Sequence, residues 1–147
     1  MNDEQLFKLL LTVLERIDDL PITWCLAGSA NLRVQGMDVP VNDLDITTTK
    51  SGVNLFEELF AHNVVKKHYS EEKQGIFLDL HINNIEVEII NYDDKKDLSM
   101  LDKIQITTWK GLKLPTLRLQ HAKRFYQMIG RDQKVALIEQ YLKNTAK

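Results

Sequence analysis

Several features are scarce in this 147-residue chain, and each scarcity excludes a class of protein. The single cysteine, Cys25, cannot form an internal disulfide, which favours a cytoplasmic setting. No apolar stretch approaches the ~20 residues of a transmembrane helix, because the longest, residues 9–14, is already interrupted by Thr12. The first five residues include two acids and no basic residue, where a secretory signal peptide would be basic. The sequence therefore predicts a cytoplasmic protein without a membrane segment.

What the chain does contain is typical of one globular domain. Hydrophobic residues make up 44% and charged residues 27% of the sequence, with no internal repeat and no low-complexity segment. A domain of this size buries roughly 68–70% of its unfolded surface, so its core needs neither disulfides nor a structural metal. Cys25 lies within the apolar run 22–27, where a buried thiol is much commoner than a catalytic nucleophile.

The net charge of −2 is distributed unevenly along the chain. Residues 1–109 contain 10 Lys and Arg against 19 Asp and Glu, whereas residues 110–147 contain 9 against 2. Two interpretations remain open. The basic end packs on the acidic body, or it faces polyphosphate or nucleic acid across an acidic, metal-holding body.

Hydrophobic periodicity predicts eleven elements in the order α-β-α-β-α-β-β-β-β-α-α. The expected helices span 3–17, 30–35, 53–62, 116–129 and 131–142, and the expected strands span 23–27, 44–47, 64–69, 76–82, 85–90 and 104–108. This order predicts an α+β (mixed α/β) fold, in which a small mixed sheet has helices on one side and a helical tail. Residues 1–115 are the expected main body, and residues 116–147 a helical extension of the same domain.

Turn and cap residues support these boundaries. Asp3 and Ser51 are the expected helix N-caps, and Gly36 is an expected carboxyl cap. Asn83 and Asn84 predict a tight hairpin turn, because asparagine tolerates the positive φ that such a turn requires.

The turn Gly28-Ser29 joins the first expected strand directly to the second helix. Glycine lets a backbone approach a ligand closely, and a helix start offers free N–H groups and a positive dipole end. The serine hydroxyl adds another donor, so the turn suits a phosphate group. Taken alone, the same two residues are more often a simple strand-to-helix turn with a serine cap.

Asp43 and Asp45 are separated by a single apolar residue. On a strand, residues two apart point to the same face and lie roughly 7 Å apart along it, so two such carboxylates can converge on hard cations. A lone Asp-x-Asp is more often a solvated strand end. Here Leu44 and Ile46 alternate with the acids and indicate a half-buried strand.

Glu86 and Glu88 offer a third carboxylate from another strand. Both face one side, because they alternate with apolar residues along 85–89. A plain edge strand would simply expose them, but Ile90 shares their face, so that side is not wholly solvated. One of the two would complete a site for two divalent ions.

Three carboxylates within a few ångströms repel and raise one another's pKa unless cations neutralise them. Two magnesium ions roughly 3.5–4 Å apart do so, and they stabilise the attacking and leaving oxygens of an in-line displacement. Carboxylate and phosphate oxygens are the ligands that magnesium prefers. The chemistry indicated is phosphoryl or nucleotidyl transfer.

The run 26–33 followed by the run 43–46 resembles the nucleotidyltransferase superfamily with the DNA polymerase beta-like fold. It is similar in particular to the minimal nucleotidyltransferases and to the aminoglycoside and lincosamide adenylyltransferases. The resemblance implies that Asp43 and Asp45 bind both metals. It also implies that a third acid on a later strand binds one metal and helps to activate the acceptor hydroxyl.

The resemblance extends along the chain to residue 142. The segment 85–89 resembles the later strand, and its Val-Glu pair matches best at Glu88, which is preferred over Glu86. The tail resembles the closing helices of the group at Leu114-Pro115-Thr116-Leu117, Lys123, Gly130-Arg131 and Lys134. The loop 38–42 lacks the basic residue and the histidine that antibiotic-modifying relatives place before the acid pair, which argues against an aminoglycoside or lincosamide acceptor.

Three basic residues are further candidates for nucleotide binding: Arg33, Lys123 and Arg131. Arg33 lies on the helical face of the Gly-Ser turn, where it reaches a phosphate or pairs with Asp38 or Asp43. Lys123 and Arg131 hold the triphosphate or the leaving pyrophosphate, or they are solvated helix charges.

Two functions follow. The first is a magnesium-dependent nucleotidyltransferase that moves a nucleoside monophosphate from ATP or another nucleoside triphosphate to a hydroxyl of a small molecule, protein or RNA. Gly28 and Ser29 would cradle the phosphates, Asp43 and Asp45 would bind the metals, and Glu88 would act as the base. The second is a nucleotide- or partner-binding module without turnover, such as an antitoxin-like regulator. Without a large second domain, the acceptor pocket is expected from the helical tail, a homodimer partner or another protein.

Overall fold

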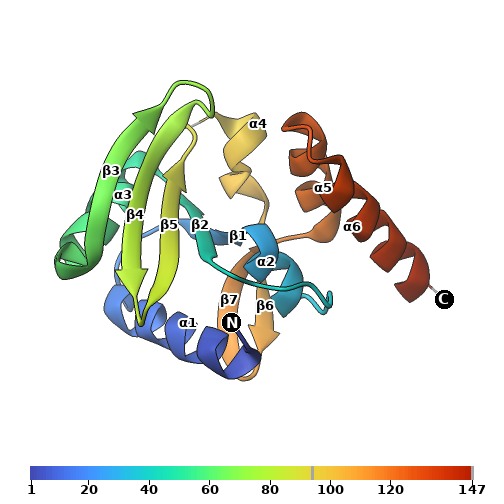
Figure 1. Cartoon of the computed structure of the whole chain (residues 1–147), viewed down its shortest axis with the longest axis horizontal. Helices are drawn as coiled ribbons and strands as arrows, with labels where there is room; N and C mark the ends of the chain where they lie inside the picture. The colour runs from blue at the N-terminus through green and yellow to red at the C-terminus, as the bar shows by residue number, and fades with distance from the viewer. Residues whose placement is uncertain (94, 147) are drawn as a thin grey trace.

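The computed structural model describes residues 1–93 and 95–146, and Asp94 in the predicted loop 91–103 lies outside the described residues. The first half contains α1 (Asp3–Ile17), β1 (Trp24–Ala27), α2 (Gly28–Val34), β2 (Leu44–Thr48), α3 (Lys50–Leu59), the 3-10 helix η1 (Ala61–Asn63) and β3 (Val64–Ser70). The second half contains β4 (Gly75–Ile82), β5 (Ile85–Asn91), α4 (Lys96–Ser99), η2 (Leu101–Lys103), β6 (Ile104–Trp109), β7 (Leu112–Leu117), α5 (Leu119–Met128) and α6 (Asp132–Thr145). Figure 1 shows their arrangement.

The main sheet has five strands in the order β1-β2-β5-β4-β3. Within the described residues β2 and β5 pair in parallel, whereas the other neighbours pair antiparallel, so the sheet is mixed. The strands β6 and β7 form a separate antiparallel ribbon. The α+β class expected from the sequence, with a mixed sheet and a helical tail, is confirmed.

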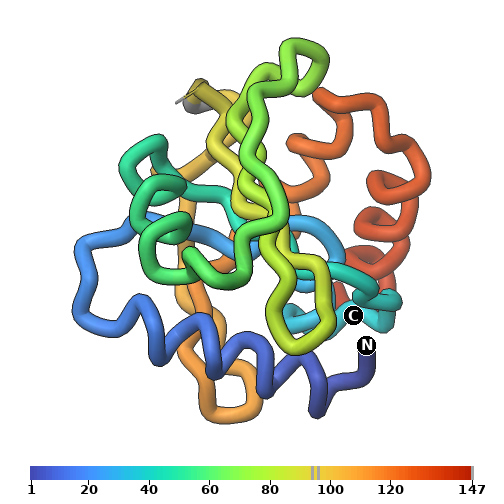
Figure 2. The backbone as a smooth tube through the Cα atoms, turned by 60° about the vertical axis from the view of Figure 1, so that its left-hand side comes forward, coloured from blue at the N-terminus to red at the C-terminus, as the bar shows by residue number. Residues whose placement is uncertain are grey.

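One face of the sheet carries the main core. Alternate residues of β2, β4 and β5 point to this face, and none is more than 1% exposed: Leu44, Ile46, Leu78, Leu80, Val87 and Ile89. They pack with the apolar stripe of α1 and with Val53 and Phe56 of α3. In Figures 1 and 2 the tip of the β4–β5 hairpin lies beside α1. The opposite face carries the residues that alternate with the core set, which include the acids Asp45, Asp79 and Glu88 as well as the buried Phe77 and Ile90.

A second apolar cluster fixes the carboxyl-terminal helices to α2. It joins α2 and the loop after it to α5 and α6 through Leu32, Met37, Val39, Leu119, Ala122, Tyr126 and Ile138. The buried amide of Asn31 adds a polar link: its Oδ1 accepts from Leu117 N at 2.9 Å, and its Nδ2 donates to Leu117 O at 3.0 Å. These contacts set the position of α5 and α6 relative to the Gly28-Ser29 turn.

Local boundaries differ from the sequence prediction at three places. The N-cap of α1 is Asn2, which forms a capping box with Gln5, rather than Asp3. The N-cap of α3 is Thr49, whose hydroxyl accepts from Gly52 N, rather than Ser51. The strand β7 was not among the expected strands, and its last two residues, 116 and 117, were expected to begin a helix.

The error at β7 has a physical reason. Pro115 made a strand improbable by propensity, but β7 is one of only two strands in its ribbon, and proline is tolerated in an edge strand.

Other local expectations are confirmed. Asn83 and Asn84 both have positive φ in the β4–β5 turn, and Gly36 follows α2 with φ +108°. In the described part of the chain, no helix combines the length and the hydrophobicity needed to cross a bilayer.

Candidate active site

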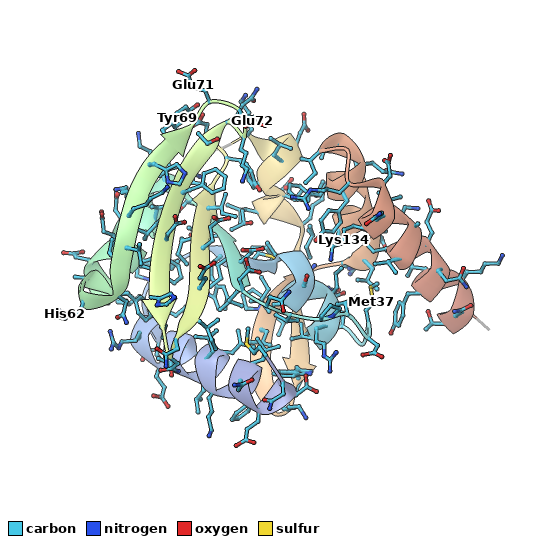
Figure 3. All side chains as sticks on the ribbon, in the orientation of Figure 1. Met37, His62, Tyr69, Glu71, Glu72 and Lys134 are labelled. Carbon is cyan, nitrogen blue, oxygen red and sulfur yellow. The ribbon has the colours of Figure 1, made fainter. Side chains whose placement is uncertain are left out.

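The strand-to-helix turn at Gly28 brings backbone close to a carboxylate. Gly28 has φ +59°, and a Cβ at this position would overlap the Asp45 side chain, so only glycine permits this approach without displacement. The next residue, Ser29, accepts a hydrogen bond of 3.4 Å at Oγ from Lys134 Nζ on α6. In Figure 3 Lys134 lies on the side of α6 that faces α2. An acid, a hydroxyl and an ammonium group therefore gather around this turn.

Three acidic residues form a row across the centre of the sheet. Asp45 on β2 pairs with Ala27 on β1 and with Glu88 on β5, and Glu88 pairs in turn with Asp79 on β4. Residues directly opposite one another on neighbouring strands project to the same face. The row therefore lies on the face opposite the core, and its Asp45 end meets the Gly28 turn.

The pKa values of two of these acids are raised. Burial, followed by the charge of Asp43, raises the pKa of Asp45 to about 6, against a smaller lowering by Lys73 and Arg131. Burial also raises the pKa of Glu88 to about 7, with further contributions from Asp45, Asp79 and Asp43. The charges of Asp43, Asp45 and Asp79 all act on Glu88, so these carboxylates form one electrostatic group around it.

The strand register separates the two glutamates that the sequence left open. Glu88 stands opposite Asp45 in the parallel pair, whereas Glu86 stands opposite the exposed His81 near the end of the β4–β5 hairpin. Glu86 is exposed, while Glu88 is partly buried. Of the two, Glu88 is the one that stands directly opposite Asp45.

The donor chemistry of this group fits magnesium, which prefers carboxylate oxygens. In the described part of the chain, however, no three acidic, histidine or cysteine side chains already converge closely enough to hold a metal ion. The acids stand on neighbouring strands without converging on one point, which is consistent with the mutual repulsion of carboxylates that no cation neutralises. Asp43 lies one residue before β2 and is exposed, so its side chain has room to turn toward the row.

Two adjoining cavities open at the acidic end of this face. One, of about 440 Å³, is lined mainly by β4 and β5 residues and includes four acids: Asp43, Asp79, Glu86 and Glu88. The other, of about 400 Å³, extends toward the start of α1 at Met1 and Gln5 and shares Asp43, His81 and Glu86 with the first. Together they form an acidic space beside the candidate metal-binding residues.

An aromatic chain connects the sheet to α5 on the other side of the row. Phe77 on β4 contacts Tyr92 edge-on at 6.4 Å between ring centroids, Tyr92 contacts Phe125 at 5.8 Å, and Phe125 contacts Tyr126 at 5.6 Å. Burial raises the pKa of Tyr126 to about 12, with a further contribution from Asp45. Burial and the charges of the same acids also raise the pKa of Tyr92. Both phenols therefore stay protonated beside the acids.

The three basic residues predicted from the sequence occupy different surroundings. The charge of Arg131, between α5 and α6, lowers the pKa of Asp45, so this guanidinium acts on the acid row. Arg33 instead donates from Nε to Asp3 at 3.0 Å and from Nη1 to Asp38 at 3.1 Å. Of the alternatives left open for Arg33, the structure shows the ion pair with Asp38.

Lys123 lies between the two final helices. Its Nζ is 4.0 Å from Oε1 of Glu139 on α6, which is a long, partly exposed ion pair. Such pairs contribute little to stability, about 0–1 kcal/mol. The structure therefore places Lys123 in an ion pair between α5 and α6.

Sequence reasoning missed Asp79 and the two tyrosines. For Asp79 the sequence did contain a signal. A two-residue turn at Asn83-Asn84 pairs Ile82 with Ile85, and continuing this register along both strands pairs Asp79 with Glu88. Tyr92 and Tyr126 gave no such signal, since their approach to the acids depends on how α5 packs against the sheet.

The chain was compared with known families and structures. Residues 9–141 match the model of the family described as Aminoglycoside-2''-adenylyltransferase. No curated protein sequence matches the chain. Among solved structures, TM1012 of Thermotoga maritima, which is assigned to the nucleotidyltransferases, has a TM-score of 0.78 and 25% identity, over 98% of this chain and 96% of that one.

Two antibiotic-modifying enzymes share the fold at lower identity. The lincosamide antibiotic adenylyltransferase LnuA, in its lincomycin-bound structure, has a TM-score of 0.59 and 15% identity over 95% of this chain and 97% of that one. ANT(2'')-Ia, in complex with adenylyl-2''-tobramycin, has a TM-score of 0.56 and 8% identity over 95% and 98% of the two chains. The family match spans most of the sequence, and these structures share its architecture. The chain therefore belongs to the Aminoglycoside-2''-adenylyltransferase family and is a nucleotidyltransferase with the fold that the sequence resemblance predicted.

Proposed function

We propose that this protein transfers AMP from ATP to a hydroxyl of an acceptor molecule, with two magnesium ions bound by Asp43, Asp45 and Glu88. The observation that carries the proposal is the direct pairing of Asp45 with Glu88 on neighbouring strands, beside the Gly28 turn. Family membership supports adenylyl transfer, and two of the similar structures are the lincosamide antibiotic adenylyltransferase LnuA and ANT(2'')-Ia in complex with adenylyl-2''-tobramycin.

Magnesium bound by these acids would neutralise the phosphate charge and align the attacking and leaving oxygens. Glu88 would accept the proton of the acceptor hydroxyl, since it lies beside the acid pair and is partly open to the acidic cavity. Asp79 continues the row beyond Glu88 and adds negative charge there, which favours the cation-bound state.

The phosphates of ATP would lie between the Gly28-Ser29 turn and the carboxyl-terminal helices. Gly28 leaves room for close approach, and Ser29 and Lys134 already contact each other across this space. Arg131 would bind phosphate oxygens bidentately, as arginine does where its planar group meets such oxygens. Arg33 is left out of this set, because its guanidinium is held by Asp3 and Asp38.

The acceptor would enter through the two acidic cavities. Four carboxylates line the larger one, so a positively charged acceptor is favoured and a polyanion such as RNA is repelled. Lincomycin and adenylyl-2''-tobramycin, the molecules bound in two related structures, show that this fold holds small molecules in those proteins. A cationic small molecule with a free hydroxyl is therefore the acceptor class that we propose.

The first test is thermal stabilisation by ATP and magnesium. At 100-fold excess over Kd, a ligand stabilises the native state by about 2.7 kcal/mol, which for this chain length raises Tm by roughly 5–10 °C. The native chain and Glu15→Gln, a change on the exposed face of α1, should show this rise, whereas Asp45→Asn should not. Equal stabilisation of all three proteins would contradict the site.

Turnover is then measured as pyrophosphate release from ATP with a panel of cationic and neutral hydroxyl compounds. Release that requires a cationic compound supports the acceptor class. Binding of ATP without release by any compound or cell extract would instead favour the second candidate, a binding module without turnover.

A further inference from the structure

The turn between β3 and β4 directs one lysine back over the sheet. The backbone N–H of Lys73 donates to Ser70 Oγ at 3.1 Å, which fixes the turn, and Lys73 Nζ lies 5.2 Å from the centroid of the Phe77 ring. Glu71 and Glu72 extend from the tip of the same turn in Figure 3. Lys73 therefore lies along the sheet, whereas its acidic neighbours face outward.

The ring beneath Lys73 belongs to the acidic face of the sheet. Phe77 lies two residues before Asp79 on β4, so both side chains project to the same side. Phe77 pairs with Ile90, which lies two residues beyond Glu88 on β5. The Phe77 ring also contacts the Tyr92 ring on this side of the sheet. The ammonium of Lys73 therefore lies over an aromatic ring on the same face of the sheet as the acid row.

The charge of Lys73 reaches the candidate catalytic acids without a direct ion pair. It lowers the pKa of Asp45 and of Glu88, opposing the larger effect of burial. Among the ion pairs of the described residues, none includes Lys73. Its ammonium therefore retains the capacity to bind an anionic ligand above the acids.

A second cation approaches the same acids from the carboxyl-terminal helices. Arg131 also lowers the pKa of Asp45, and it lies between α5 and α6. Figures 1 and 2 both place the β3–β4 turn and the α5–α6 turn at the same end of the molecule. A polyphosphate that extends from the acid row toward this end would meet Arg131 on one side and Lys73 on the other.

We propose that Lys73 is a phosphate-binding residue of this enzyme and contacts the β- and γ-phosphates that leave as pyrophosphate. This inference rests on the proposed nucleotidyl transfer. Asp43, Asp45 and Glu88 with bound magnesium would act at the α-phosphate, where the bond breaks, so a cation farther along the sheet would meet the leaving group. As a compact point charge on a flexible stem, a lysine suits such a position.

The test measures the affinities of three probes, ATP with magnesium, AMP and inorganic pyrophosphate, by titration calorimetry. Lys73→Met should weaken the binding of ATP and of pyrophosphate by about 10-fold or more, as the loss of one charge-assisted contact predicts. The affinity for AMP should change less than about twofold, and Lys73→Arg should restore most of the ATP affinity, because arginine also pairs with phosphate.

Lys110→Met is the matched control, because Lys110 also lies in a turn with its Nζ over an aromatic ring, 5.5 Å from the centroid of Trp109. It should leave all three affinities unchanged. The Tm of each variant without ligand checks its folding. If Lys73→Met bound ATP and pyrophosphate as tightly as the native chain, the proposal for Lys73 would be overturned. The same would follow if the variant lost affinity for AMP as strongly as for ATP. Either result would leave the nucleotidyl-transfer proposal intact. A native chain that binds neither ATP nor pyrophosphate would overturn both.

Discussion

Asp45 on β2 and Glu88 on β5 are direct partners across the parallel strand pair in the interior of the main sheet. Their side chains project to the face opposite the core, and burial, followed by the charge of Asp45, raises the pKa of Glu88. The same pairing places Asp45 against the Gly28 turn through its other neighbour, Ala27. Several measurable consequences follow from this arrangement.

The chain without metal should lose stability as the pH rises from about 4 to 7. Asp45 and Glu88 have ordinary values of 3.8 and 4.5, and their folded-state pKa values are raised to about 6 and about 7. The folded protein therefore binds more protons than the unfolded chain in this range, and the free energy of unfolding falls with pH. For Asp45 the loss is about 3 kcal/mol, and for the more exposed Glu88 solvent screening makes it smaller.

Chemical denaturation with EDTA at a series of pH values checks this expectation. Asp45→Asn should flatten the profile and be the more stable protein at pH 8, while magnesium should restore stability to the native chain only. A native profile that rises through this range would show that the two acids are not destabilised by burial.

Gly28→Ala should destabilise the fold more than Gly130→Ala does. Both glycines have positive φ, but a Cβ at Gly28 would overlap Asp45, whereas a Cβ at Gly130 meets nothing within 4 Å. We expect a loss of about 1 kcal/mol for Gly130→Ala from backbone strain alone and about 2–3 kcal/mol for Gly28→Ala. Urea unfolding measures both.

The same pair of variants separates strain from function. Because only Gly28→Ala displaces the Asp45 carboxylate, it alone should weaken the binding of ATP with magnesium. If Gly130→Ala weakened that binding as much, the close approach at Gly28 would have no special role.

Glu88→Gln should abolish turnover, whereas Glu86→Gln should have little effect. Glu88 adjoins Asp45, and Glu86 faces His81 near the hairpin end. Loss of a general base typically lowers the rate by about 10²–10⁴-fold. The rate of pyrophosphate release with an acceptor found in the panel measures both variants, and the reverse order of effects would assign the third carboxylate to Glu86.

Asn31→Ala should loosen the carboxyl-terminal helices. Asn31 is 2% exposed and bonds both backbone groups of Leu117, just before α5. Leaving these buried groups with fewer partners should cost about 1–3 kcal/mol. Hydrogen exchange should then speed up in α5 and α6 relative to α1, while the exposed Asn144→Ala serves as the control. Uniform exchange changes across the chain would indicate a general rather than a local effect.

Much of this architecture could be predicted from the sequence because the strands alternate clearly. The alternation at Leu44, Asp45 and Ile46 predicted a strand with one apolar and one acidic face. The pair Asn83-Asn84 predicted the hairpin turn. The family resemblance followed from the turn and the acid pair, and the comparisons confirm it. These features are local, and the physical chemistry of a short segment determines them.

Features that depend on contacts distant in sequence could not be predicted in this way. The ion pair of Arg33 with Asp3 could not be predicted, because it forms only where the fold brings α1 beside α2. The approach of Lys134 to Ser29 depends on the docking of α6 against α2. The strand β7 forms despite Pro115, because pairing with β6 stabilises it, and this pairing could not be predicted from the segment alone.

The parallel pairing of β2 with β5 also affects the order in which the enzyme acquires its activity during folding. A parallel pair cannot be closed by a short turn, and here α3, β3 and β4 intervene between its two strands. Such non-local pairings have a high contact order and form slowly, after the entropy of closing the intervening segment has been lost. A refolding chain should thus regain affinity for ATP with magnesium no earlier than the slow phase in which its tertiary structure is completed.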